Sequence, residues 1–180
     1  VLEHAMKNIV ILGSTGSIGT NTLDIVDRFP QEFRVVGLTA GSNDEKLEAQ
    51  IRKFRPAFAA LANEAAAARL RDRCADLPVK ILAGNEGVAE VAQSQEAELV
   101  ISAIVGGAGL LPTLAAIRAG KQIALANKEP MVMAGALMQA EAKKHHVRIF
   151  PIDSEHSAIF QSLEGHRRED VKRIILTASG

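Results

Sequence analysis

The sequence lacks most features that mark secreted, membrane-spanning and nucleic-acid-binding proteins. Its 180 residues include a single cysteine, Cys74, and no tryptophan or tyrosine. A lone cysteine cannot form a disulfide within the chain, and no secretory signal pattern opens the sequence, so we expect a cytoplasmic protein. No charge-free apolar run reaches the roughly 18 residues that a membrane span requires. Aromatic residues at 3% leave few stacking platforms for single-stranded nucleic acid.

The charges balance, with 21 Lys and Arg against 21 Asp and Glu, so the formal net charge is zero. A protein whose main partner is nucleic acid or an anionic membrane surface presents a net basic footprint, which this total does not supply. We therefore expect no nucleic acid and no membrane as partner, and a small molecule as ligand. Hydrophobic residues make up 47% of the chain, enough for a packed core.

Short runs rich in Val, Ile, Leu and Ala alternate with amphipathic segments from Met6 onward. Continuous apolar strands of this kind are buried on both faces, and the segments between them are long enough for helical crossovers. The pattern predicts an α/β fold with a doubly wound parallel sheet. The expected strands are residues 9–12, 34–39, 57–61, 79–83, 99–104, 122–126, 147–150 and 173–177, and the expected helices are residues 18–29, 44–54, 64–73, 108–119 and 132–144.

A glycine-rich turn follows the first expected strand and opens a helix, the context that a dinucleotide-binding motif needs. Its spacing is G-x-x-G-x-x-G, formed by Gly13, Gly16 and Gly19. We expect Gly13 to permit the tight turn, Gly16 to let a pyrophosphate approach the backbone, and Gly19 to let the helix pack closely. Three hydroxyl groups in the turn could also donate to phosphate oxygens: Ser14, Thr15 and Ser17. The alternative is a tight turn without a ligand.

The end of the second expected strand carries no carboxylate, because the sequence there is Thr39-Ala40-Gly41-Ser42-Asn43. NAD enzymes usually place Asp or Glu at this point, on the ribose 2′-hydroxyl. A site without that charge does not repel a 2′-phosphate, and Ser42 and Asn43 could donate to it, so NADP is favoured over NAD. The alternative is that this pair caps the helix that begins at Asp44.

Two further loops fall at the carboxyl ends of expected strands, where ligands bind in open α/β sheets. Residues 103–109 contain three glycines, which would allow close backbone approach. The strand 122–126 ends in Asn127-Lys128-Glu129-Pro130. Lys128 could polarise a carbonyl group or hold a phosphate or alkoxide. As an alternative, Lys and Glu beside a proline are common residues of a solvated loop.

A pair of carboxylates, Asp153 and Glu155, follows the strand at residues 147–150. Carboxylate oxygens suit Mg²⁺ or Mn²⁺. Alternation along an extended segment would direct both groups to one side, while Ser154 could contribute to a substrate or metal. The competing interpretation is that Asp153 or Ser154 caps a helix over residues 155–163, with Glu155 in its first turn.

Four motifs together resemble the 1-deoxy-D-xylulose 5-phosphate reductoisomerase family: residues 13–19, residues 103–113, Asn127-Lys128-Glu129 and Asp153-Ser154-Glu155-His156. The resemblance runs from about Asn8 to Gly180. Members of this family are homodimers that rearrange 1-deoxy-D-xylulose 5-phosphate, a sugar phosphate. They reduce the product with NADPH to 2-C-methyl-D-erythritol 4-phosphate in non-mevalonate isoprenoid synthesis. The resemblance thus implies an NADP-dependent oxidoreductase that uses Mg²⁺ or Mn²⁺.

The resemblance also assigns roles to individual residues. The NADPH pyrophosphate would be held by Thr15, Gly16, Ser17 and Ile18, beyond the turn at Gly13. The adenosine ribose phosphate would lie near Gly41, Ser42 and Asn43, and the cofactor would also be faced by Asn127 and Glu129. Lys128 would contact substrate oxygens, and Asp153 and Glu155 would bind the metal. Substrate would be contacted by Ser154, Glu155 and Ser179, with Lys128 and Glu155 as the catalytic residues.

The resemblance divides the chain into a Rossmann-type NADPH-binding domain over residues 1–150 and the beginning of a catalytic domain over residues 151–180. This sequence has Ser42 where some relatives have a basic residue, and Pro130-Met131 where a Ser-Leu pair is expected. The family's lid and a further metal ligand would lie beyond Gly180, so we expect the chain alone to be inactive. Two other interpretations stay open: another NADP-dependent oxidoreductase of the semialdehyde or homoserine dehydrogenase type, and a cofactor-binding module without catalysis.

Overall fold

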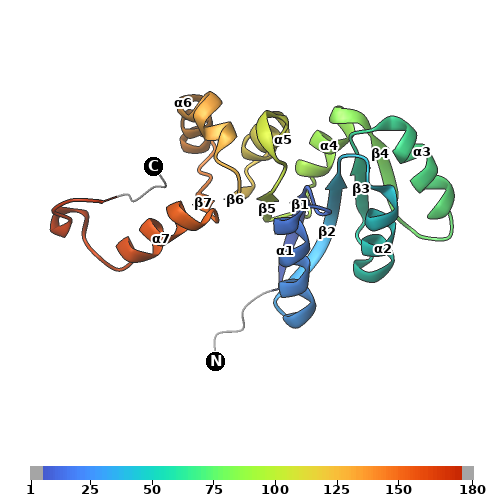
Figure 1. Cartoon of the computed structure of the whole chain (residues 1–180), viewed down its shortest axis with the longest axis horizontal. Coiled ribbons are helices and arrows are strands. Elements are labelled where there is room, and N and C mark those ends of the chain that lie inside the picture. Colours follow the sequence, from blue (N-terminus) through green and yellow to red (C-terminus); the bar gives the residue numbers. More distant parts are fainter. Residues whose placement is uncertain (1–5, 176–180) are drawn as a thin grey trace.

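The computed structural model describes residues 6–175 and has a parallel sheet with helices on both faces (Figure 1). The seven strands lie in the order β4-β3-β2-β1-β5-β6-β7, and every neighbouring pair is parallel. The strands are β1 (Lys7–Leu12), β2 (Phe33–Ala40), β3 (Phe58–Leu61), β4 (Lys80–Ala83), β5 (Leu99–Ser102), β6 (Gln122–Leu125) and β7 (Ile149–Pro151). The α-helices are α1 (Ser17–Arg28), α2 (Asp44–Phe54), α3 (Glu64–Arg73), α4 (Gly84–Ala92), α5 (Leu110–Arg118), α6 (Glu129–Lys144) and α7 (Ser154–Leu163).

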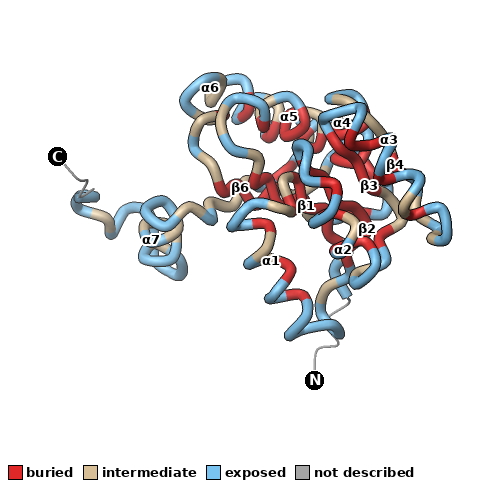
Figure 2. The backbone as a smooth tube through the Cα atoms, turned by 45° about the vertical axis from the view of Figure 1, so that its right-hand side comes forward, coloured by how far each residue is buried: buried red, intermediate tan, exposed pale blue. Residues whose placement is uncertain are grey.

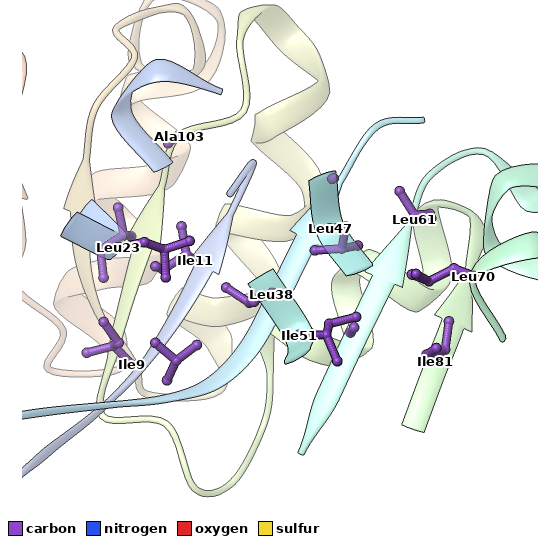
Figure 3. Close-up of a cluster of buried hydrophobic side chains, with 14 of the residues drawn as sticks. Ile9, Ile11, Leu23, Leu38, Leu47, Ile51, Leu61, Leu70, Ile81 and Ala103 are labelled. Carbon is purple, nitrogen blue, oxygen red and sulfur yellow. The ribbon is translucent and has the colours of Figure 1, made fainter. Parts of the chain in front are cut away.

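Alternation along the strands builds two cores, one on each face of the sheet. On β1, Ile9 and Ile11 pack with buried side chains of α1, α2 and α3, while Val10 and Leu12 pack with those of α4, α5 and α6. Figure 3 shows the first of these cores, in which side chains from the strands meet those of α1, α2 and α3. Because successive strand residues point to opposite faces, an unbroken apolar run fills both cores. The predicted doubly wound α/β fold is confirmed.

The chain changes direction across the sheet at β1. From β1 it winds outward through β2, β3 and β4, then returns with β5 to the other side of β1 and continues to β6 and β7. In such sheets the ligand crevice lies outside the carboxyl ends of the two strands at this switch point. Here those ends are Leu12 of β1 and Ser102 of β5, which pair in register.

Two predictions from the sequence were wrong. Helix α4 was not foreseen, because two glycines in its nine residues lower helix propensity. Its buried side chains, Val88 and Val91, nevertheless pack onto the sheet. The expected strand at residues 173–177 is not formed where the structure describes it, since residues 171–175 are in neither helix nor strand. Residues 176 and 177 lie outside the described part.

The chain leaves the sheet after β7. Helix α7 lies beside this edge, and Figures 1 and 2 show it projecting away from the body of the molecule. Within the described residues, α7 has no buried side chain, in contrast to α1 through α6. Helix α6 begins three residues earlier than expected and bends at Ala134, whose φ and ψ are −147° and 33°. Among the described residues, no helix has the length and apolar character needed to cross a membrane.

Candidate functional site

The glycine-rich turn between β1 and α1 has the tight geometry that its sequence predicts. Gly13 has a φ of 81°, and the backbone N–H groups of Gly13 and Ser14 both donate to the carbonyl oxygen of Thr39, at 3.0 and 2.8 Å. A Cβ atom at Gly19 would overlap the backbone of Gly13 and Ser14, so only glycine lets α1 start this close to the turn. The roles expected for Gly13 and Gly19 are therefore confirmed.

Ser14 does not have the role expected for it. Its side chain is completely buried, and its hydroxyl donates to Gln50 Oε1 at 2.7 Å. Gln50 in turn donates through Nε2 to the backbone carbonyl oxygen of Ser14, at 2.9 Å. These bonds join the glycine-rich turn to α2, so the Ser14 hydroxyl is not available to a phosphate. Sequence reasoning missed Gln50, although a polar residue between Leu47 and Ile51 on the buried face of α2 was a usable signal.

The N-terminus of α1 is open to a ligand. Gly16, Ser17 and Ile18 are exposed, and in the part of the chain that the structure describes α1 has neither a capping side-chain bond nor an acidic residue in its first turn. The first N–H groups of a helix have no partner within the helix and carry partial positive charge. This terminus can therefore bind an anion such as a pyrophosphate.

The loop after β2 lies next to this turn. Gly41, Ser42 and Asn43 are all exposed there. Asn43 Oδ1 accepts a hydrogen bond from the backbone N–H of Lys46 at 3.0 Å, so the predicted helix cap is present and is made by Asn43. The cap uses only the carbonyl oxygen of this side chain, which leaves its NH₂ group as a donor.

Asp44, the first residue of α2, is nearly buried and bound by two arginines of α3. Its carboxylate accepts from Arg69 Nε at 2.9 Å and from Arg73 Nη2 at 2.9 Å. The hydrogen bonds and charge of Arg69, aided by Arg73, outweigh the effect of burial and lower the pKa of Asp44 to about 2. Asp44 is therefore ionised at neutral pH, and its charge is compensated.

The loops after β5 and β6 are held together by Asn127. Its side-chain Nδ2 donates to the carbonyl oxygen of Ile104 at 2.8 Å. The neighbouring Glu129 begins α6, and its Oε2 atom is buried without a hydrogen-bond partner among the described residues. A buried carboxylate oxygen without a partner is costly, and a bound ligand that donates to it would remove that cost.

Lys128 and Asp153 come from the ends of the adjacent strands β6 and β7 and face each other. Lys128 Nζ lies 3.7 Å from Asp153 Oδ2, and His156 Nδ1 lies 3.0 Å from Asp153 Oδ1. Burial alone would raise the pKa of Asp153, but its contacts with Glu155 and His156 and the charge of Lys128 lower that pKa below its ordinary value. His156 belongs to the Asp153-Ser154-Glu155-His156 motif, but the sequence alone did not indicate a role for it.

The segment that carries the two carboxylates is not extended, so the expected alternation was the wrong reason for their proximity. Helix α7 begins at Ser154, which places Asp153 at the N-cap and Glu155 in the first turn, as the competing interpretation held. In the described structure the Asp153 side chain makes no capping bond. Ser154 instead donates its hydroxyl to Glu155 Oε2 at 2.9 Å. The Asp153 carboxylate thus faces Lys128 and His156 rather than the backbone N–H groups of α7, and a metal ion would share it with these two side chains.

This pair of carboxylates is compatible with Mg²⁺ but is not a complete metal site. The part of the chain covered by the structure contains no group of three or more His, Cys, Asp or Glu side chains that could hold a metal ion. Mg²⁺ commonly retains several waters and binds through one or two carboxylates together with substrate oxygens. The ionised Asp153 and the exposed Glu155 match that demand.

A cavity of about 850 Å³ lies between α6, β7 and α7. Its polar lining residues are Asn127, Lys128, Gln139, Lys143, Asp153 and His156, and its apolar walls include Met131 and Phe160. A volume of this order is typical of pockets for small molecules, which are mostly apolar with a few polar groups that orient the ligand.

The predicted site residues therefore fall into two groups. One group surrounds the glycine-rich turn and the end of β2: Gly13, Thr15, Gly16, Ser17, Ile18, Gly41, Ser42 and Asn43. The other follows β6 and β7: Asn127, Lys128, Glu129, Asp153, Ser154 and Glu155. All of these follow carboxyl ends of parallel strands and so belong to one edge of the sheet. Ser179 lies outside the described residues.

Comparison with known proteins points to one family for both groups. Residues 9–135 match the model for 1-deoxy-D-xylulose 5-phosphate reductoisomerase, and residues 149–180 match the model for the C-terminal domain of the same enzyme. The curated 1-deoxy-D-xylulose 5-phosphate reductoisomerase of Chlorobaculum tepidum is 56% identical over 97% of this chain, which covers 46% of that protein. The chain thus spans about half the length of the curated relatives that it matches.

Solved structures agree. The enzyme from Zymomonas mobilis in complex with NADPH is 39% identical, with a TM-score of 0.86 over 91% of this chain and 43% of that one. A reductoisomerase solved with NADPH, fosmidomycin and magnesium is 45% identical, with a TM-score of 0.86 over 89% of this chain and 40% of that one. Sequence, fold and the order of the motifs all lead to the same conclusion: the chain belongs to the 1-deoxy-D-xylulose 5-phosphate reductoisomerase family.

Proposed function

We propose that this chain forms the NADPH-binding part, and the first segment of the catalytic part, of an NADP-dependent oxidoreductase. The intact enzyme converts 1-deoxy-D-xylulose 5-phosphate to 2-C-methyl-D-erythritol 4-phosphate in isoprenoid biosynthesis. The observation that carries this proposal is the family match over residues 9–135, which includes the glycine-rich turn at the switch point of the sheet. Relatives solved with NADPH and magnesium support both cofactors.

NADPH would bind across the first group of residues. The open N-terminus of α1, with Thr15, Gly16, Ser17 and Ile18, would hold the pyrophosphate, while Gly41, Ser42 and Asn43 would border the adenosine ribose. Asn127, in the loop after β6, and Glu129, at the start of α6, would face the cofactor, and the buried Oε2 of Glu129 would accept a hydrogen bond from it. Bound NADPH supplies the hydride for the reduction.

The sugar phosphate and the divalent metal would bind across the second group. Asp153 and Glu155 would hold Mg²⁺ or Mn²⁺, which acts as a Lewis acid on substrate oxygens. Lys128 would bind substrate oxygens with its ammonium group, which already lies beside Asp153. Ser154, Glu155 and Ser179 would complete the contacts to substrate. Lys128 and Glu155 are thus the proposed catalytic residues.

We propose a domain boundary at residue 150, with the NADPH-binding domain before it and the catalytic domain from residue 151. The sheet ends with β7 (Ile149–Pro151), one residue past this boundary, and α7 has no buried side chain among the residues described. Both observations support a division close to this point. We also propose that the intact protein is a cytoplasmic homodimer, as the family resemblance implies. Sedimentation of the intact protein and fractionation of its host cells test these two statements.

The proposal is tested in two stages. Titration of this chain with NADPH, followed by the fluorescence of the reduced nicotinamide, should show saturable binding, because the chain contains the first group of residues. The intact protein should then oxidise NADPH only when both 1-deoxy-D-xylulose 5-phosphate and Mg²⁺ are present. Turnover without a divalent metal would favour a dehydrogenase of another type, and NADPH binding without turnover would favour a binding module.

A further inference from the structure

The loop after β2 does not by itself explain a preference for NADPH. Residues 39–43 contain no carboxylate, which removes repulsion, but they contain no basic residue either. The carbonyl oxygen of the Asn43 side chain is engaged in the helix cap. NADPH differs from NADH by a phosphate group on the adenosine ribose, and recognition of a phosphate usually requires a cation or several donors. Residues 39–43 can supply hydrogen-bond donors but no positive charge, so a cation at this phosphate has to come from another residue.

Lys46 brings such a charge to the required place. It lies in the first turn of α2, and its Nζ donates to the backbone carbonyl oxygen of Thr15 at 2.9 Å. The ammonium group is thus held between the glycine-rich turn and the start of α2, where the adenosine ribose of a dinucleotide lies. Lys46 is exposed, and its ammonium group has two more donors besides the one bound to Thr15.

The acidic residues beside Lys46 do not neutralise its ammonium group. Asp44 is the nearly buried carboxylate of this turn, and it is already bound by Arg69 and Arg73. Glu45 is exposed, so solvent and salt screen its charge. Gln50, one helical turn after Lys46, fixes α2 to Ser14 of the same glycine-rich turn. Lys46 therefore extends from a helix that is anchored to the turn it contacts.

We propose that Lys46 determines the preference for NADPH over NADH by placing its ammonium group against the 2′-phosphate of the adenosine ribose. This inference rests on the proposed function and names the specificity-determining residue of its cofactor site. The contact with Thr15 holds the long side chain in place before the cofactor arrives, which reduces the entropy lost on binding.

The test compares the dissociation constants of NADPH and NADH for the unchanged chain and three variants. Lys46→Gln removes the charge, and Lys46→Arg retains it. Lys53→Gln is the matched control, because Lys53 lies in the last turn of the same helix and pairs with Asp27. We expect Lys46→Gln to weaken NADPH binding about tenfold or more, as loss of a charge-assisted hydrogen bond does, and to leave NADH binding within about twofold. Lys46→Arg and Lys53→Gln should keep the preference for NADPH.

Each outcome separates this inference from the proposed function. If Lys46→Gln weakens both nucleotides equally, or neither, Lys46 does not read the 2′-phosphate, and the proposed function stands. If the unchanged, folded chain binds neither NADPH nor NADH, the cofactor site itself is wrong and the inference falls with it. Circular dichroism of every variant establishes that the fold is retained, and Lys46→Met, which also removes the charge, replaces Lys46→Gln should that variant unfold.

Discussion

Replacement of Gly13 by alanine should destabilise the fold by combining two separate costs. The residue has a φ of 81°, where an L-residue loses about 1–2 kcal/mol. Its new Cβ would also lie 2.7 Å from the carbonyl oxygen of Ala103, the residue directly after β5. This overlap involves backbone on both sides and cannot be relieved by a rotamer change, so an overpacking cost of about 1–3 kcal/mol applies. Together the two costs amount to about 2–5 kcal/mol.

Two other glycines serve as matched controls, because the chain offers each geometry separately. Gly106 has a φ of 73°, but within the described structure a Cβ there would meet nothing within 4 Å. Gly106→Ala should therefore lose only the backbone cost of about 1–2 kcal/mol. Gly41 has neither a positive φ nor, among the described residues, a neighbour within 4 Å. Gly41→Ala should leave stability unchanged or raise it by up to about 1 kcal/mol.

The assay is urea unfolding followed by far-ultraviolet circular dichroism, since the chain has no tryptophan to report by fluorescence. The expected order of stability is Gly41→Ala first, then Gly106→Ala, then Gly13→Ala. If Gly13→Ala unfolds at the same urea concentration as Gly106→Ala, the close approach of β1 and β5 at the switch point does not constrain this residue, and the packing argument fails.

Three further predictions concern the cofactor, the metal and pH. Gly16→Val should abolish NADPH binding, because the side chain would occupy the path of the pyrophosphate; a titration that still saturates would contradict this. In the intact enzyme, Glu155→Gln should lower turnover by orders of magnitude while NADPH binding persists, and unchanged turnover would refute the metal assignment. The depressed pKa of Asp44 contributes stability that is lost as the pH falls from about 4 to about 2. The free energy of unfolding should therefore fall less between about pH 4 and about pH 2 in Asp44→Asn than in the unchanged chain. Identical pH profiles of the two proteins would refute the pairing of Asp44 with Arg69.

The order of local patterns along the sequence was sufficient for most of the fold. Apolar runs of four to six residues predicted the strands, and the G-x-x-G-x-x-G spacing identified the turn after β1, because these signals depend on residues close together in the chain. Helix α4 was not predicted because its stability comes from the packing of Val88 and Val91 onto the sheet rather than from helix propensity. The apolar run at 173–177 shows the reverse over its described residues 173–175, which form no strand, since a strand needs a partner edge as well as a suitable composition.

Contacts between distant segments determine which polar groups face a ligand and which bond to other parts of the protein. Ser14 and Thr15 are adjacent in sequence, yet the Ser14 hydroxyl is buried against Gln50, while the backbone carbonyl oxygen of Thr15 accepts from the exposed ammonium group of Lys46. Likewise, the sequence indicated that Lys128 and Asp153 follow neighbouring strands, but their pairing depends on where α7 begins. The physical reason is that sequence pattern determines which face of an element is apolar. The partners of a polar group are determined by segments far along the chain, which meet only when the sheet has formed.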